Sequence, residues 1–116
     1  MNETSPLLHV AHRADLERAR TDGYYRCASL ETEGFIHCCA PAQLAGVLER
    51  YYAGMEGLVL LSLDGEALGA ELRHESPPGG TERFPHVYGP IELVAIRKTT
   101  PFDPDGPLIE LIREGV

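Results

Sequence analysis

Leu58-Val59-Leu60-Leu61-Ser62-Leu63 is an almost uninterrupted apolar run that ends at Asp64-Gly65. A strand with one face in water alternates between apolar and polar side chains, whereas a strand covered on both faces is apolar throughout. Asp-Gly is a turn signal. We therefore predict a central strand at residues 58–63, around which the core of the protein is built.

The chain before this strand begins with a strand and a helix. Residues 7–11 are a short apolar run that contains His9, and residues 13–20 are strong helix formers. Gly23 follows them and is a natural C-terminal stop. The pattern predicts one strand and one helix, both packed against the central strand.

A second strand and helix come next. Residues 24–30 read as a connecting segment, residues 35–39 as a strand, and Pro41 as the first residue of a helix, a position that proline favours. An apolar stripe at helical spacing follows and is expected to pack in the core: Leu44, Val47, Leu48, Tyr51 and Tyr52.

Strands dominate the second half of the chain. We predict an edge strand at residues 71–75, a loop at residues 76–81 and a strand at residues 93–97 after the Gly89-Pro90 turn. Gly79-Gly80 lacks the lysine and the spaced glycines of a phosphate-binding loop. It is expected to be a flexible lid or the tip of a hairpin.

Together these segments predict a single compact α+β domain over residues 1–116. It has a mostly antiparallel sheet, two helices in its first half and a core over about residues 7–101. The segment 101–116 is turn-rich, and residues 108–113 within it fit either a helix turn or a strand.

Composition excludes several classes of protein. The 116 residues carry a formal net charge of −8, which disfavours extended nucleic-acid binding but leaves room for a pocket that takes one nucleotide. Three cysteines cannot all pair within one chain, so we expect a reduced, cytoplasmic protein. We expect no leader peptide and no membrane span, because the longest apolar run is only residues 58–63.

The segment Glu33-Gly34-Phe35-Ile36-His37-Cys38-Cys39 places an imidazole in an apolar, strand-like run. Side chains alternate along a strand, so His37 shares its face with Phe35 and Cys39. A buried neutral imidazole needs a hydrogen-bond partner, and the oxygen-bearing candidates nearby are Ser29, Glu31 and Glu33. The alternative is a core histidine whose local hydrogen bond only fixes the loop.

A second histidine motif is Phe84-Pro85-His86-Val87-Tyr88-Gly89-Pro90. His86 and Tyr88 are two residues apart and face the same side of an extended segment, where they could bind a ribose hydroxyl, stack on a planar ring or relay a proton. Glu75 and Glu92 are the carboxylates nearest in sequence, as general base, ribose ligand or solvated side chains. The alternative is that this segment forms a purely structural rim and binds no ligand.

Metal and thiol chemistry are disfavoured. His37, Cys38 and Cys39 are adjacent on a strand and do not converge on one ion, and no second ligand pair completes a tetrahedral site. We therefore expect no metal site. Neither Cys27 nor Cys39 has a helix N-terminus or a cation nearby in sequence that would lower the pKa of its thiol.

The succession of His9, Ser29, Gly34-Phe35-Ile36-His37, Gln43, His74-Glu75 and the motif at residues 84–90 resembles the bacterial domain-of-unknown-function family 952. The resemblance covers residues 9–101 and implies a stand-alone cytoplasmic α+β domain. It also implies a set of site residues: His9, Ser29, His37, Gln43, Glu75, His86 and Tyr88.

More remotely, a first strand with His9, a helix and a strand with Gly34-Phe35-Ile36-His37 is similar to the start of the ADP-ribosyltransferase and RNA 2′-phosphotransferase superfamily. That resemblance implies an ADP-ribosyltransferase-like fold, a first-strand histidine that holds a nucleotide ribose, and NAD as cofactor. The late glutamate of the superfamily is not matched securely by Glu75 or Glu92.

The leading hypothesis is a nucleotide-related or NAD-related pocket that joins His9, His37, His86 and Tyr88. In this hypothesis His37, Glu75 and His86 are catalytic in an ADP-ribosyl- or phospho-transferase-like reaction, while the remaining site residues bind the small-molecule substrate: His9, Ser29, Gln43 and Tyr88. One alternative is a non-catalytic domain that binds a small metabolite or a protein through structural histidines. The other is a metal-dependent hydrolase. The oligomeric state stays open.

Overall fold

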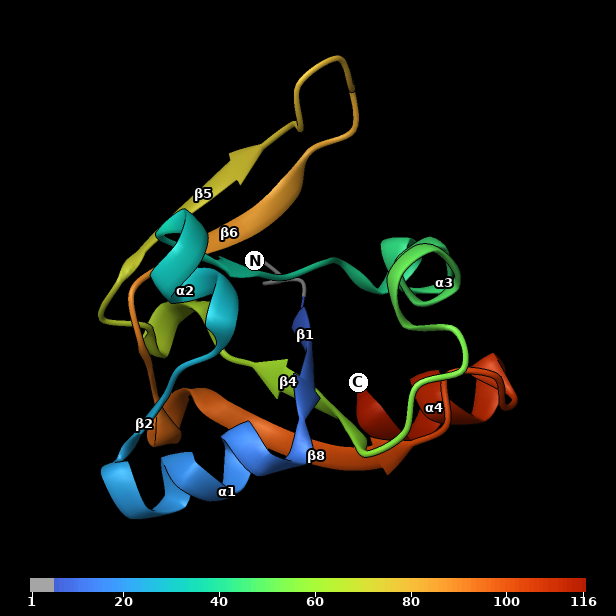
Figure 1. Ribbon diagram of the computed structural model, residues 1–116, viewed down its shortest axis with the longest axis horizontal. Coiled ribbons are helices and arrows are strands. Elements are labelled where there is room, and N and C mark those ends of the chain that lie inside the picture. Colours follow the sequence, from blue (N-terminus) through green and yellow to red (C-terminus); the bar gives the residue numbers. More distant parts are fainter. Residues whose placement is uncertain (1–5) are drawn as a thin grey trace, which may run out of the picture.

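The computed structural model describes residues 6–116, so the start of the chain, on which the expected absence of a leader partly rests, lies outside it. Its main sheet is antiparallel with the order β1-β4-β8, formed by β1 (Leu7–His12), β4 (Leu58–Leu63) and β8 (Ile96–Phe102). All six residues of β4 are buried, which confirms the predicted central strand (Figure 1).

Two hydrophobic cores lie on opposite faces of this sheet, because alternate residues of a strand point to opposite sides. Leu61 and Val59 belong to a core with Leu16 and Ala19 of helix α1 (Arg13–Asp22). The second core contains, among others, Leu58, Leu60, Leu8, Leu44, Leu48 and Leu111. Burial on both faces explains why the sequence of β4 is apolar throughout.

A second three-stranded sheet carries both histidine motifs. Its order is β3-β6-β5, from β3 (Ile36–His37), β6 (Phe84–Tyr88) and β5 (Glu71–Glu75), and every pairing is antiparallel. A short pair of strands, β2 (Tyr24–Tyr25) and β7 (Ile91–Glu92), completes the β structure. The hairpin of β5 and β6 projects at the top of Figure 1.

Several predictions from the sequence are confirmed. The domain is α+β with antiparallel sheets, α1 ends at Gly23 in the left-handed region with φ 87°, and β5 is an edge strand. The second helical region begins at Pro41 in a 3-10 helix (Pro41–Gln43) and continues through α3 (Leu44–Val47) and a π-helix (Leu48–Tyr52).

Other predictions were wrong in part. The supposed connecting segment contains β2 and helix α2 (Ala28–Glu33), and the strand predicted at residues 93–97 is a 3-10 helix (Leu93–Ala95) before β8. The strand at residues 35–39 is regular only at β3. Residues 108–113, for which the sequence left a helix turn and a strand as alternatives, lie in helix α4 (Leu108–Gly115).

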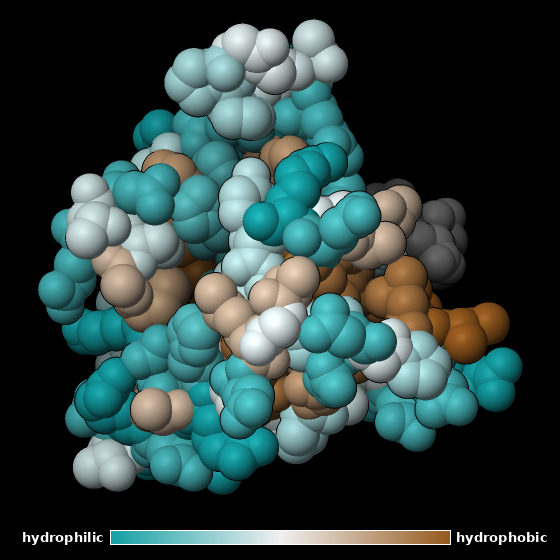
Figure 2. All heavy atoms as spheres, turned by 45° about the vertical axis from the view of Figure 1, so that its right-hand side comes forward, coloured by the Kyte–Doolittle hydropathy of each residue, from teal (hydrophilic) through white to brown (hydrophobic). Residues whose placement is uncertain are grey.

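The predicted apolar stripe also needs one correction, because Tyr51 is 63% exposed and lies outside the core. Figure 2 shows a mostly hydrophilic surface on the face turned forward, with smaller apolar areas. No helix within residues 6–116 has the length and apolar character needed to cross a membrane.

Candidate functional site

The end of α2 positions the first histidine motif. Gly34 takes a left-handed conformation with φ 92° and ends the helix, so that the chain turns directly into β3. The Ser29 hydroxyl donates a hydrogen bond of 2.8 Å to the carbonyl oxygen of Phe35. The His37 Nε2 lies 3.2 Å from both carboxylate oxygens of Glu33, one of the partners expected from the sequence.

The hairpin of β5 and β6 supplies the second motif. His86 Nδ1 lies 2.8 Å from Glu75 Oε1, and the Tyr88 hydroxyl donates a 2.6 Å hydrogen bond to the same oxygen. Because Tyr88 and then His86 stabilise the carboxylate, the pKa of Glu75 is lowered. The same hydrogen bond raises the pKa of Tyr88. Glu75 is therefore a partner of both rings and not a merely solvated side chain.

The two motifs meet because β3 pairs with β6, with His37 opposite His86. The Phe35 ring stacks on the His86 ring, with centroids 4.1 Å apart and an angle of 19° between planes. The His37 and His86 rings are edge to face at 5.2 Å. Phe35 also contacts His37 and Tyr88. We call this group the imidazole cluster: Glu33, Phe35, His37, Glu75, His86 and Tyr88.

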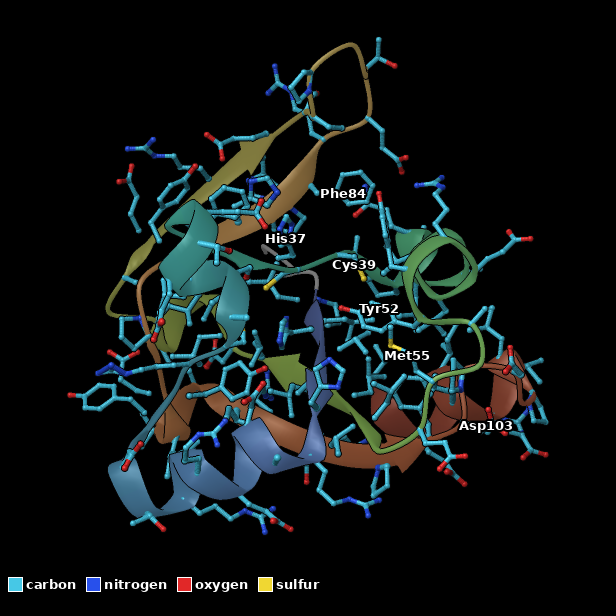
Figure 3. The ribbon with its side chains drawn as sticks, viewed as in Figure 1. His37, Cys39, Tyr52, Met55, Phe84 and Asp103 are labelled. Carbon is cyan, nitrogen blue, oxygen red and sulfur yellow. The ribbon has the colours of Figure 1, made fainter. Side chains whose placement is uncertain are left out.

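The imidazole cluster lies on the face of the β3-β6-β5 sheet opposite the core. Ile36, Leu72 and Val87 alternate with its members and point into the first hydrophobic core. The side chain of His37 is 51% exposed and that of His86 only 11%. Figure 3 shows His37 near α2 and β6, whereas Cys39 and Phe84 lie further towards α3.

Each imidazole has one nitrogen held by a carboxylate and one that no residue within 6–116 bonds: His86 Nε2 and His37 Nδ1. No deeply buried polar side-chain atom of the described residues lacks a partner. The free nitrogen of His86 is therefore reached by solvent. This arrangement can bind a ligand and can exchange protons with it.

His9 lies apart from the imidazole cluster. It is 5% exposed, and its Nδ1 donates to the backbone oxygen of His37 at 2.6 Å. Burial lowers the pKa of His9 to about 4, so the ring is neutral and its Nε2 accepts a 2.7 Å hydrogen bond from the Tyr25 hydroxyl. Both nitrogens are used within the protein. The structure therefore separates His9 from the predicted common pocket.

Two more predicted site residues have partners within the chain. Ser29, as described, holds Phe35 and also lies 3.4 Å from the Cys27 sulfur. Gln43 accepts from the Ala40 N–H and donates to Glu82 and to the Arg83 carbonyl oxygen. Both side chains hold the segments that flank the imidazole cluster and do not enter it.

The remaining candidates from the sequence lie elsewhere. Glu92 accepts a hydrogen bond from the Gly69 N–H. All three cysteines are free thiols, and burial raises the pKa of Cys38 and raises that of Cys39 to about 12. Residues 6–116 contain no group of three or more His, Cys, Asp or Glu side chains arranged to hold a metal ion.

Sequence reasoning missed Tyr25, Arg73 and the stacking role of Phe35. The Arg73 guanidinium lies over the Tyr88 ring, 4.6 Å from its centroid, and pairs with Glu71 at 3.0 Å. Arg73 is two residues before Glu75 on β5, so strand alternation could have placed both beside the His86 and Tyr88 face. Tyr25 gave no local signal, because its partner His9 is 16 residues away.

Two surface hollows, of about 430 Å³ and 390 Å³, lie away from the imidazole cluster. The first is next to Ser62 and Lys98, and the second lies between α1 and the segment that leads into α2. Neither is lined by a member of the cluster. The predicted site therefore coincides with neither of these two hollows.

The family model described as "Protein of unknown function (DUF952)" matches residues 10–99. The chain belongs to the DUF952 family. All six members of the imidazole cluster lie within the matched residues. No curated protein matches the chain.

This DUF952 chain is similar to protein CC0527 from Caulobacter crescentus. The X-ray structure of CC0527 is 29% identical in sequence, with a TM-score of 0.80 over 94% of this chain and 99% of that one. The solution NMR structure of CC0527 is 27% identical, with a TM-score of 0.66 over 86% of each chain. The similarity therefore extends over nearly the whole domain.

Proposed function

We propose that the imidazole cluster binds a nucleotide, with NAD as the leading candidate. The observation that carries this proposal is the pair of carboxylate-held imidazoles, each with one open nitrogen, next to the Tyr88 phenol and the Phe35 ring. Open nitrogens can accept hydrogen bonds from ribose hydroxyls, and aromatic rings can stack on a base or on nicotinamide.

The proposed chemistry is transfer of ADP-ribose from NAD to an acceptor nucleophile of a second substrate. His86 as general base takes the proton of that nucleophile, the nucleophile bonds to the ribose carbon, and nicotinamide leaves as its bond to that carbon breaks. The Nδ1–H of His86 donates a hydrogen bond to Glu75 Oε1, so a neutral His86 has its lone pair on the solvent-reached Nε2. NAD is suggested by the remote resemblance of the first strands and helix to ADP-ribosyltransferases, whereas the family model and the solved structures above match DUF952 and CC0527. His9, the residue that suggested it, is buried here, so the proposal places the ligand at the imidazole cluster instead.

The test is a titration with NAD, ADP-ribose and AMP, followed by the thermal midpoint and by the ring NMR signals of His37 and His86. A ligand that binds only the folded state raises the midpoint. We expect NAD at millimolar concentration to raise it and to shift both ring signals, and His86→Ala to lose both effects. His74→Ala is the control, because His74 alternates with Arg73 and points to the other side of β5. No stabilisation by any of the three compounds would overturn the proposal.

The second candidate function is a non-catalytic domain that binds a partner protein. It is supported by the location of the imidazole cluster on an open face outside the two hollows. Under this function neither the unchanged protein nor His86→Ala responds to NAD. The same titration therefore separates the two functions.

A further inference from the structure

The open atoms of the imidazole cluster have one property in common. Glu75 uses only Oε1 for Tyr88 and His86, so within residues 6–116 its Oε2 is free to accept. With neutral imidazoles, His86 donates through Nδ1 and His37 through Nε2, so their open nitrogens carry lone pairs. The Tyr88 hydroxyl already donates its hydrogen bond to Glu75, so its oxygen can only accept. All four groups are therefore acceptors.

The charges around these acceptors disfavour an anionic ligand. Glu33 lies on the β3 side of the rings, and Glu71 and Glu75 lie on the β5 side. Among residues 6–116, Arg73 is the one lysine or arginine whose side chain contacts the cluster, and its guanidinium already pairs with Glu71. An acceptor-only anion such as phosphate would meet carboxylates and lone pairs without a donor.

The protein itself shows which chemical group fits this face. Arg73 places a planar cation over the Tyr88 ring and donates to both carboxylate oxygens of Glu71. This combines a cation–π contact with a bidentate hydrogen-bonded pair. The Phe35 and His37 rings pack against His86, which is bonded to Glu75 Oε1, and the second oxygen of Glu75 is open.

We infer that the ligand group bound by the imidazole cluster is a small planar cation that donates hydrogen bonds, such as an amidine, a guanidinium or a cationic carboxamide ring. This inference rests on the proposed function only for the location of the site. For a nucleotide such as NAD, it places the cationic ring at the cluster and the phosphates outside it.

Benzamidine, benzamide and benzoate test this inference, because they share a planar ring and differ in charge and donors. In mildly alkaline buffer, we expect benzamidine to shift the ring NMR signals of His37 and His86. Its affinity should exceed that of benzamide by about tenfold, from the added charge-assisted hydrogen bond. Benzoate should not bind. Benzoate binding as tightly as benzamidine, or no binding by any compound, would overturn the inference.

Glu75→Gln should reduce the preference for benzamidine over benzamide to about twofold or less, because it replaces the open carboxylate by an amide. Glu110→Gln is the matched control, since it removes the same charge from an exposed site on α4. Circular dichroism checks that both variants are folded, and Glu33→Gln provides a second variant at the cluster. An unchanged preference in both cluster variants contradicts the inference.

Two further arms complete the experiment. Methylguanidine and a capped arginine peptide, titrated in the same way, distinguish a free small molecule from an arginine of a partner protein: tighter binding of the peptide assigns the cation to a protein. Binding of benzamidine without NAD overturns the proposed function and supports the inference. Binding of NAD at the cluster without binding of benzamidine supports the proposed function and overturns the inference.

Discussion

His9 makes the stability of this domain depend on pH. Burial disfavours the charged ring and lowers the pKa of His9 in the folded protein to about 4, below its ordinary value of 6.5. Between pH 6.5 and about 4, His9 of the unfolded chain binds a proton and His9 of the folded chain does not. The contribution of His9 to the unfolding free energy is therefore fully present above pH 6.5 and is lost as the pH falls towards 4. Each pKa unit is worth about 1.4 kcal/mol, which predicts a loss of roughly 3 kcal/mol from His9.

Urea unfolding measured across this pH interval tests the prediction. His9→Asn retains a donor near the Nδ1 position and cannot titrate, so its unfolding free energy should lack this part of the pH dependence. The exposed His74, changed to Asn, serves as control and should keep it. The same slope in His9→Asn as in the unchanged protein would show that other groups cause it.

Tyr25 provides a second prediction at this scale. Tyr25→Phe keeps the buried ring and removes the hydroxyl that donates to His9, which leaves the Nε2 of His9 without a partner. Such a loss costs about 1–3 kcal/mol of unfolding free energy. Tyr24→Phe is the neighbouring control, because Tyr24 is 46% exposed. Equal stabilities of the two variants in urea would contradict the hydrogen bond.

At the scale of the elements, we expect Gly→Ala to change stability in opposite directions at the end and in the interior of a helix. Gly23 ends α1 with φ 87° and has open space where a Cβ would lie, so Gly23→Ala costs only the left-handed conformation, about 1–2 kcal/mol. Gly46 lies inside α3, and an added Cβ there would meet only the flexible end of Arg50. Gly46→Ala should stabilise by about 0.5–1 kcal/mol. Thermal midpoints that move in the same direction would refute this pair.

Elements with a clear apolar period or a clear stop were predictable from the sequence. The run in β4 and Gly23 after α1 are such cases, and both were confirmed. Helix α2 was missed because it has no buried residue and hence no apolar period. The segment Leu93–Ala95 is apolar but forms a 3-10 turn, and an apolar run of this length does not distinguish a turn from a strand.

The candidate site was predictable only where local geometry decides it. Strand alternation placed His86 and Tyr88 on one face, and both indeed reach Glu75. The sequence could not show that His37 lies opposite His86, because the register between β3 and β6 joins residues far apart in the chain. For the same reason it grouped His9 with them, although His9 points towards Tyr25.

At the scale of the whole molecule, the central strand β4 contributes residues to both cores. Leu60 and Leu61 are adjacent, both are fully buried, and they belong to opposite cores. Each change to Ala should cost about 2–5 kcal/mol of unfolding free energy. Because β4 connects the cores, we expect one cooperative transition for both variants, with fluorescence and circular dichroism giving the same midpoint. Separate transitions in either variant would show that the cores unfold independently.

The projecting hairpin of β5 and β6 has a practical consequence. Residues 76–83 are exposed, and the bonds from Gln43 hold the loop only at its end, at Glu82 and Arg83. Exposed loop tips tolerate insertions well. A short epitope or a fluorophore-bearing peptide grafted between Pro78 and Gly79 would therefore report on the nearby β strands from outside the packed body, and the domain should fold around it unchanged.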